Sequence, residues 1–300
     1  MSVNLYKLRK WTKMMLGKSI SHVNQKEGRL YSKELICGYY NDLTEKVTKG
    51  NGEIVPKYYV DTGEKLYFSI GIFQYGLGAY DLYLLSGKKD LSAFDKVKAC
   101  ADWAVENQQE DGAWSTFAFE NPGYPYSSMA QGEGISLLLR IYSETPNNCY
   151  LRAAEKAKDF MLKPFEEGGT AKYEGKDVYL YEYPKGSLVL NGWIFSIWGL
   201  MDYCKVVDDN KVRGILYETL LTLEKKLSVF DIKYWSLYDD ANRIASPFYH
   251  KLHIAQLNVM FDLTGHDVYR EYAMLWDGYA DNGFNRMRAF VKKVFQKIFE

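Results

Sequence analysis

Four long apolar segments recur along the chain at a nearly constant interval, and each carries an amide side chain near its start. Successive amides are 57, 60 and 65 residues apart. After a short polar break, each apolar segment is followed by an amphipathic one, whose apolar residues recur every three or four positions as on a helix with one buried face. The apolar segments are 73–87, 130–144, 190–204 and 255–265, and the amphipathic ones are 91–107, 150–162, 211–227 and 267–279. A repeat of this length predicts stacked helical hairpins.

The apolar helices determine how these hairpins can be arranged, because a helix that is apolar all round must be buried on every side. About four hairpins therefore fit a ring, with apolar helices inside and amphipathic helices outside. The sequence thus predicts an all-α fold, an α/α barrel or toroid. An open α-solenoid is the competing arrangement. A closed ring is favoured because the sequence has no visible polar capping repeat.

Some stretches depart from the helical pattern. Residues 171–183 alternate like a strand around Gly175, and residues 234–247 read as a loop or short strand, so a short β-hairpin and a loop should interrupt the barrel. Residues 1–65 are expected to form an N-terminal arm that packs on a barrel domain spanning 66–300.

Net charge and composition limit the functions that this chain can have. Lys and Arg total 38, as do Asp and Glu, and this zero balance argues against a nucleic-acid partner. Aromatic residues make up 16% of the chain, including 26 Tyr, which suits either an ordinary core or a cleft whose rings stack on sugars. The 4 cysteines lack zinc or redox spacing and are interpreted as reduced thiols, which favours a cytoplasmic protein.

Both ends of the chain are basic. Residues 1–18 carry five cations and no acid, and residues 284–300 carry five cations against Glu300. Either end could lie on an anionic surface as a peripheral contact with the inner membrane, or pack on the protein with a solvated basic face, which is the favoured interpretation. No uncharged apolar run reaches the roughly 18 residues that a spanning helix needs. The oligomeric state stays open, a homodimer included.

Four motifs carry a resemblance to a known family. They are ADWAVENQQEDGAW, YSSMAQGEGISLLLRIY, YEYPKGSLVLNGWIFSIWGL and SPFYHKLHIAQL. In this order and at this spacing, over about 66–280, they resemble the C-terminal domain of glucuronyl C5-epimerases, the heparan and heparosan epimerases of animals and their bacterial relatives. The animal enzymes also carry a membrane anchor and a large β-rich region before the first motif. Here FQYGLGAYD is followed almost directly by that motif, so the β-rich region is expected to be missing.

The resemblance implies an isomerase that converts D-glucuronate to L-iduronate residues within a heparosan-like or capsular glycan. Such an enzyme removes the C5 proton, α to a carboxylate, and returns one to the opposite face, so it needs two proton-transfer groups. By resemblance, the catalytic residues are Glu182, Tyr183, Tyr238 and Tyr249. Glu182 and Tyr249 are assigned as the two acid/base groups, and Tyr183 and Tyr238 as orienting or relay groups, with Tyr234 as the alternative to Tyr238. In an extended strand Glu182 and Tyr183 would point to opposite faces, so the chain must bend near Pro184.

Five further residues are candidates for substrate binding. Arg243 could pair with the substrate carboxylate, with an ordinary surface arginine as the alternative. The other four are Tyr75, Gln131, Asn191 and His253, and for the two amides capping or interhelical bonding is the alternative. No metal site is expected, because His250 and His253 lack a third ligand at suitable spacing. The proposed chemistry needs no cofactor.

Two other functions stay open. A uronate polysaccharide lyase on the same barrel would share the first proton abstraction and then eliminate the C4 substituent. A non-catalytic glycan-binding protein would keep the aromatic cleft without the chemistry.

Overall fold

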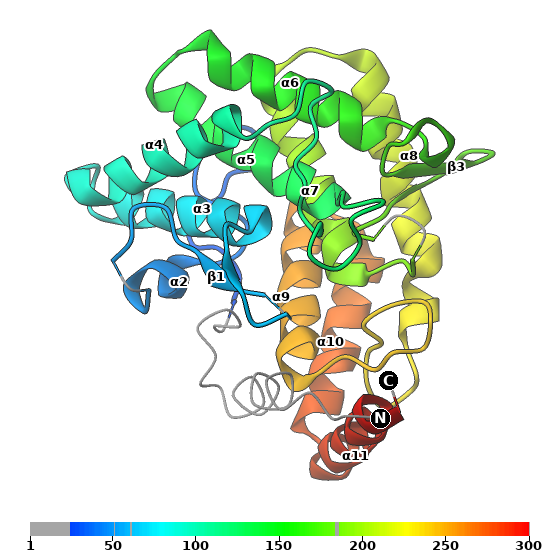
Figure 1. Ribbon diagram of the computed structural model, residues 1–300. Helices are drawn as coiled ribbons and strands as arrows, with labels where there is room; N and C mark the ends of the chain where they lie inside the picture. Colours follow the sequence, from blue (N-terminus) through cyan, green and yellow to red (C-terminus); the bar gives the residue numbers. More distant parts are fainter. Residues whose placement is uncertain (1–24, 51, 61, 184–185, 300) are drawn as a thin grey trace.

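Four helical hairpins form the body of the protein, which confirms the predicted all-α barrel (Figure 1). The computed structural model describes residues 25–50, 52–60, 62–183 and 186–299. Each inner helix packs on the next around the ring. The inner helices are α3 (Ser69–Leu85), α5 (Ser128–Glu144), α7 (Leu190–Val206) and α9 (Pro247–Thr264). The outer helices are α4 (Leu91–Glu106), α6 (Asn148–Leu162), α8 (Asn210–Lys226) and α10 (Asp267–Asp281).

The polar breaks in the sequence repeat act as helix caps. Asp90, Asn147 and Asp209 stand just before α4, α6 and α8, and each side chain accepts a hydrogen bond from a backbone N–H in the first turn. Ser127 and Ser246 do the same for α5 and α9. Such a cap typically contributes about 1 kcal/mol. The breaks therefore both end one helix and start the next.

Among the described residues, the remaining elements are short, apart from helix α11. A β-hairpin follows α6, and Gly175 makes its turn with φ 62°, as the sequence predicted. The strands are β1 (Tyr58–Tyr59) paired with β2 (Lys65–Leu66), and β3 (Ala171–Glu174) paired with β4 (Asp177–Leu180). The other helices are α2 (Thr44–Thr48), η1 (Phe165–Glu167), η2 (Leu227–Phe230) and α11 (Gly283–Phe299). Within the described residues, no helix is long and apolar enough to cross a membrane.

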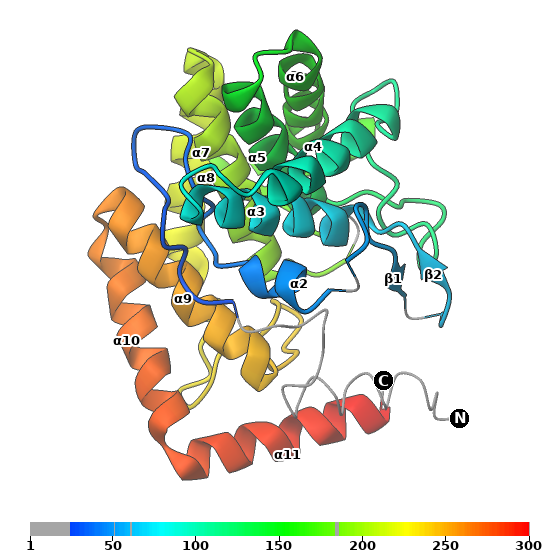
Figure 2. The same cartoon turned by 90° about the vertical axis from the view of Figure 1, so that its left-hand side faces the viewer.

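Residues 25–50 bridge the first and last inner helices. Figure 2 shows this segment running beside α3 and α9. Asn258 Nδ2 on α9 donates to Glu27 Oε1 at 2.8 Å, and the Tyr39 N–H donates to Asp81 Oδ1 on α3 at 2.9 Å. The ring of four hairpins is thus completed by an irregular segment.

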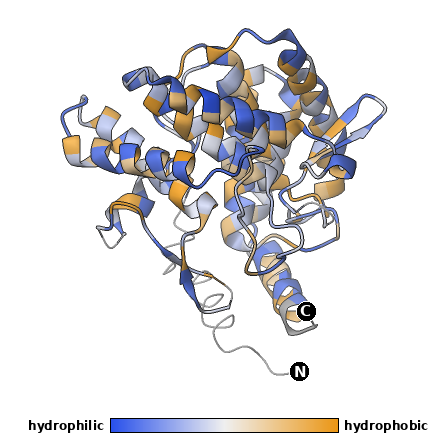
Figure 3. Cartoon of the chain, turned by 45° about the horizontal axis from the view of Figure 1, so that its top comes forward, coloured by the Kyte–Doolittle hydropathy of each residue, from blue (hydrophilic) through white to orange (hydrophobic). Residues whose placement is uncertain are grey.

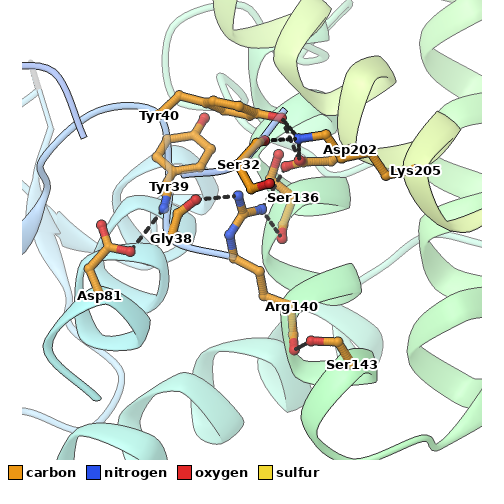
Figure 4. Close-up of polar contacts among 10 residues, drawn as sticks. All are labelled: Ser32, Gly38, Tyr39, Tyr40, Asp81, Ser136, Arg140, Ser143, Asp202 and Lys205. Carbon is orange, nitrogen blue, oxygen red and sulfur yellow. Dashed lines mark hydrogen bonds and ion pairs between the residues drawn. The ribbon is translucent and has the colours of Figure 1, made fainter. Parts of the chain in front are cut away.

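A buried ion pair lies where this segment meets α5 and α7 (Figure 4). Arg140 Nη1 is 2.6 Å from Asp202 Oδ2, and the two side chains are 1% and 0% exposed. Arg140 Nη2 donates to the Gly38 carbonyl at 3.0 Å, and the Tyr40 hydroxyl donates to Asp202 Oδ1 at 2.6 Å. Two inner helices and the N-terminal segment therefore share one charged centre.

The inner helices α5 and α7 cross at glycines. A Cβ atom on Gly132 would lie 2.6 Å from the Phe195 carbonyl oxygen and 2.7 Å from the Ser196 Cα, both backbone atoms that cannot swing aside. We expect Gly132→Ala to lower the free energy of unfolding by about 2 kcal/mol, as overpacking does. Urea denaturation measures this change.

Gly214 on α8 is the matched control, because a Cβ there meets nothing within 4 Å. Gly214→Ala should stabilise by about 0.5–1 kcal/mol, since alanine loses less backbone entropy in a helix than glycine. Equal effects of the two substitutions would contradict the close crossing.

Candidate active site

The four catalytic candidates come from three segments and meet in one cluster. Glu182 and Tyr183 follow β4, Tyr238 lies in the loop before α9, and Tyr249 lies in the first turn of α9. The rings of Tyr238 and Tyr249 pack edge to face with centroids 4.8 Å apart. Burial raises the pKa of Tyr238 well above its usual value, and the charge of Glu182 raises it further. Tyr183, Tyr238 and Tyr249 all remain partly exposed, so the cluster can be reached from solvent.

Glu182 and Tyr183 face the same cluster because the chain has already left the strand. β4 ends at Leu180, and the Tyr183 carbonyl accepts a hydrogen bond from the Gly186 N–H at 2.8 Å, which closes a turn. Pro184 lies outside the described residues. The Tyr183 ring packs on Phe117 with centroids 4.5 Å apart. Burial raises the pKa of Tyr183 well above its usual value, and the Glu182 charge adds to this, so Tyr183 holds its proton at neutral pH.

Glu182 lies against the start of α7, where a glycine makes room for it. The side chain is 5% exposed, and a Cβ atom on Gly192 would lie 2.4 Å from Glu182 Oε2. Oε2 is buried without a hydrogen-bond partner among the residues that the structure describes. Burial raises the pKa of Glu182 to about 8, although a hydrogen bond with Tyr183 and the charge of Arg243 oppose this. Glu182 is therefore a carboxyl group that titrates near neutral pH.

Arg243 lies at the edge of the cluster. Its guanidinium pairs with the buried Asp239 and donates from Nη2 to Ser187 Oγ at 2.8 Å. The Arg243 side chain is 40% exposed, and its Cζ atom is 5.6 Å from the centroid of the Tyr238 ring. Asp239 thus orients the guanidinium beside the tyrosines, and the Arg243 side chain stays partly exposed.

Asn191 and His253 occupy inner helices close to the catalytic candidates. Asn191 precedes the glycine that packs on Glu182, and its Oδ1 atom is buried without a partner in the described part of the chain. His253 lies one turn after Tyr249. Its Nδ1 atom shares a hydrogen bond with Ser236 Oγ at 3.1 Å, and its buried Nε2 atom has no partner among the described residues. Burial, followed by the charge of His250, lowers the pKa of His253 well below its usual value, so the ring is neutral.

Gln131 and Tyr75 both donate hydrogen bonds to backbone carbonyls. Gln131 Nε2 donates to the carbonyls of Gly112 and Ala157, at 2.9 and 3.2 Å. The Tyr75 hydroxyl donates to the Glu53 carbonyl at 2.8 Å, on the side of the N-terminal segment. The Gln131 side chain thus bonds between helices, which was the alternative to a substrate-binding role. Neither Gln131 nor Tyr75 contacts the tyrosine cluster in these hydrogen bonds.

Sequence reasoning missed a second buried polar group inside the ring. Gln74 Nε2 donates to Glu133 Oε1 at 2.7 Å, and the other carboxylate oxygen has no partner within the described ranges. Burial raises the pKa of Glu133 well above its usual value, and the charge of Glu182 raises it further, which places the two carboxyl groups within electrostatic reach. Burial lowers the pKa of Lys46 to about 8. An acid within a mostly apolar inner helix was the available signal for Glu133.

A cavity of about 550 Å³ lies beside α9. It is lined by residues 25–27, Trp235, α9, α10 and the start of α11, and none of the four catalytic candidates borders it. The candidate reaction centre is the tyrosine cluster, where the carboxyl group of Glu182, with its raised pKa, meets the phenols. In the described part of the chain, no three His, Cys, Asp or Glu residues come together as a metal site would require.

A family model and a curated relative of this chain both point to one protein family. Residues 103–278 match the family described as D-glucuronyl C5-epimerase C-terminus. A D-glucuronyl C5-epimerase of Caenorhabditis elegans is 30% identical over 213 residues, which are 61% of this chain and 34% of that protein. An uncharacterized protein of Methanocaldococcus jannaschii is 27% identical over 171 residues, 53% of this chain and 56% of that protein. The chain thus spans about a third to about half of the length of these relatives.

Two solved structures are similar in fold. A UGL variant described with dGlcA-Glc-Rha-Glc has a TM-score of 0.51 at 12% identity, covering 94% of this chain and 82% of that one. A glycosyl hydrolase family 88 protein from Bacteroides vulgatus has a TM-score of 0.47 at 12% identity, covering 77% of this chain and 66% of that one. The first likeness supports the α/α barrel and nothing beyond the fold.

Proposed function

Since the chain belongs to the D-glucuronyl C5-epimerase family, we propose that it inverts C5 of glucuronate residues within a polysaccharide, with a heparosan-like or capsular glycan as substrate. The observation that carries the proposal is the meeting of Glu182 with three tyrosines from separate segments. Its substrate is a uronate polymer, and its chemistry uses no cofactor. The four free thiols are in keeping with a cytoplasmic site of action.

The proposed reaction uses Glu182 as base and Tyr249 as acid. Ionised Glu182 takes the C5 proton, and the electron pair of the C–H bond moves into the substrate carboxylate to form an aci-carboxylate. The Tyr249 hydroxyl then delivers its proton to C5 from the opposite face. The cation of Arg243, beside the Tyr238 ring, offsets the charge that develops on the substrate.

Tyr183 and Tyr238 are proposed to orient the sugar and relay protons. Burial raises the pKa of both phenols well above the usual value, so both remain hydrogen-bond donors at neutral pH. This division of roles is consistent with the carboxyl group being the member of the cluster that ionises near neutrality.

Incubation with heparosan in heavy water, followed by NMR of the polymer, tests the function. We expect deuterium at C5 together with signals of iduronate, because the returned proton comes from a group that exchanges with solvent. A rise in ultraviolet absorbance from an unsaturated uronate would identify a lyase instead. Absence of both signals across a panel of uronate polymers would favour a non-catalytic glycan-binding protein.

A further inference from the structure

Helix α11 has two faces of opposite character. Ala289, Lys293 and Gln296 repeat at helical spacing and pack on the protein. Val291 lies two positions from Lys293, about 200° around the helix, and so points the other way. Figure 3 shows hydrophobic and hydrophilic residues alternating along this helix, which ends near the C-terminus.

The inner face of α11 holds the loop that carries the catalytic candidate Tyr238. Lys293 Nζ donates to the Ile244 carbonyl at 2.8 Å, and Gln296 bonds both to the Ile244 N–H and to the Asn242 carbonyl, at 2.9 and 2.8 Å. The guanidinium of Arg288 stacks on the Tyr234 ring, 3.8 Å from its centroid. Arg288 makes this contact from the side of Phe284 and Val291, and the hydrogen bonds of Lys293 and Gln296 attach the helix through its inner face.

The outer face is apolar and strongly exposed. Its exposed side chains are Phe284 at 75%, Met287 at 63%, Val291 at 43% and Phe295 at 56%. These positions recur at three and four residues, so they form one stripe along the helix. A contiguous apolar stripe on a surface helix marks a docking site.

The charges beside this stripe are all positive. Residues 283–299 contain no acidic residue; Lys292 lies beside the stripe, and Arg286 lies further round the helix, toward the inner face. A second copy of α11 would bring like charges together, and so would the chain's own residues 1–18, which carry five cations and no acid. An anionic partner with an apolar interior would match both the apolar stripe and the cations beside it.

We propose that α11 docks on an anionic lipid surface, with its apolar stripe among the acyl chains and its cations on the headgroups. This is the geometry of an interfacial amphipathic helix, whose binding scales with buried apolar area and with attraction to anionic lipid. Because the opposite face of α11 holds residues 242–244, docking also fixes the tyrosine cluster close to the lipid surface. The basic segment 1–18, the other sequence candidate for membrane contact, lies outside the described residues.

Flotation of the full-length protein with vesicles tests this surface without any assay of activity. We expect binding to phosphatidylcholine vesicles that contain phosphatidylglycerol, with at least about 10-fold weaker binding to pure phosphatidylcholine. The triple substitution Phe284→Gln, Val291→Gln, Phe295→Gln should weaken binding to the anionic vesicles at least about 10-fold. Arg286→Gln with Lys292→Gln should weaken it by up to about 25-fold and reduce its dependence on salt.

Leu91→Gln on α4 is the matched control, because Leu91 is 67% exposed and lies on another face of the protein. It should leave vesicle binding unchanged. Equal binding to both kinds of vesicle, or anionic binding that survives the triple substitution, would overturn the proposal. So would a dimer in light scattering that the triple substitution dissolves, because a second copy would then be the partner.

Discussion

Replacing Glu182 with glutamine is expected to slow exchange at C5 by at least about 100-fold, the usual loss for a general acid or base. Glutamine keeps the size of the side chain and its place against Gly192, but it cannot take a proton. Tyr249→Phe should cause a loss of similar size, because it removes the proton that returns to the opposite face. NMR of heparosan in heavy water measures both. Near-normal exchange in both variants would mean that other residues carry the chemistry.

The pH dependence of the wild-type enzyme tests the same assignment. Burial raises the pKa of Glu182 to about 8, so below this pH the ionised base becomes scarcer. The rate should rise about tenfold per pH unit up to about pH 8 and level off above it. Glu182→Gln should abolish this limb.

The same substitution should stabilise the fold, which separates lost chemistry from lost structure. A raised pKa means that the folded protein binds the Glu182 proton more tightly than the unfolded chain does, so stability falls as pH rises from about 4.5 to about 8. At pH 7 this cost is about 3 kcal/mol, at about 1.4 kcal/mol per unit of pKa shift. Glu182→Gln should remove it at pH 7 and change little at pH 4. A less stable Glu182→Gln protein at pH 7 would contradict the buried carboxylate.

Replacing Arg140 with methionine is expected to lower the free energy of unfolding by about 3–5 kcal/mol. The substitution leaves Asp202 fully buried and, among the described residues, balanced by the more distant Lys205 cation, 3.6 Å away. It also removes a donor to the Gly38 carbonyl, which loosens the N-terminal segment. Urea denaturation followed by circular dichroism gives the change.

Two further variants test whether the loss comes from the buried ion pair. The double variant Arg140→Met, Asp202→Leu should recover part of the loss, because the buried carboxylate is removed with its partner, while Lys205 keeps its bonds to the Ser32 carbonyl and the Tyr40 hydroxyl. Lys98→Met breaks an exposed pair with Asp102 on α4 and should cost less than about 0.5 kcal/mol. A loss below about 1 kcal/mol for Arg140→Met would show that the buried pair contributes little.

The helical ring could be predicted because its signal is local and repeated. Apolar segments, caps such as Asp209 and the turn at Gly175 each depend on a few neighbouring residues. Completion of the ring by residues 25–50 could not be predicted, because it depends on pairs such as Glu27 with Asn258, which are 231 positions apart and have no periodic pattern.

Sequence resemblance supplied the catalytic candidates, and the structure adds what surrounds them. The chain turns at Tyr183, and the Tyr183 side chain therefore lies beside that of Glu182. Spacing could not distinguish Gln131, which bonds to neighbouring carbonyls, from Asn191, which keeps an unpaired oxygen among the described residues. The repeated amides have different partners although they occupy equivalent positions in the repeat.

The N-terminal segment also has a consequence for biosynthesis. Residues near Glu27 leave the ribosome early, yet Asn258 is made more than two hundred residues later. Until α9 has been made, the partly made chain exposes the surfaces of α7 and of the segment near Glu27 that α9 will cover. Contacts this distant in sequence form slowly. Completion of the chain, rather than formation of its first hairpin, should set when the nascent protein ceases to need a chaperone.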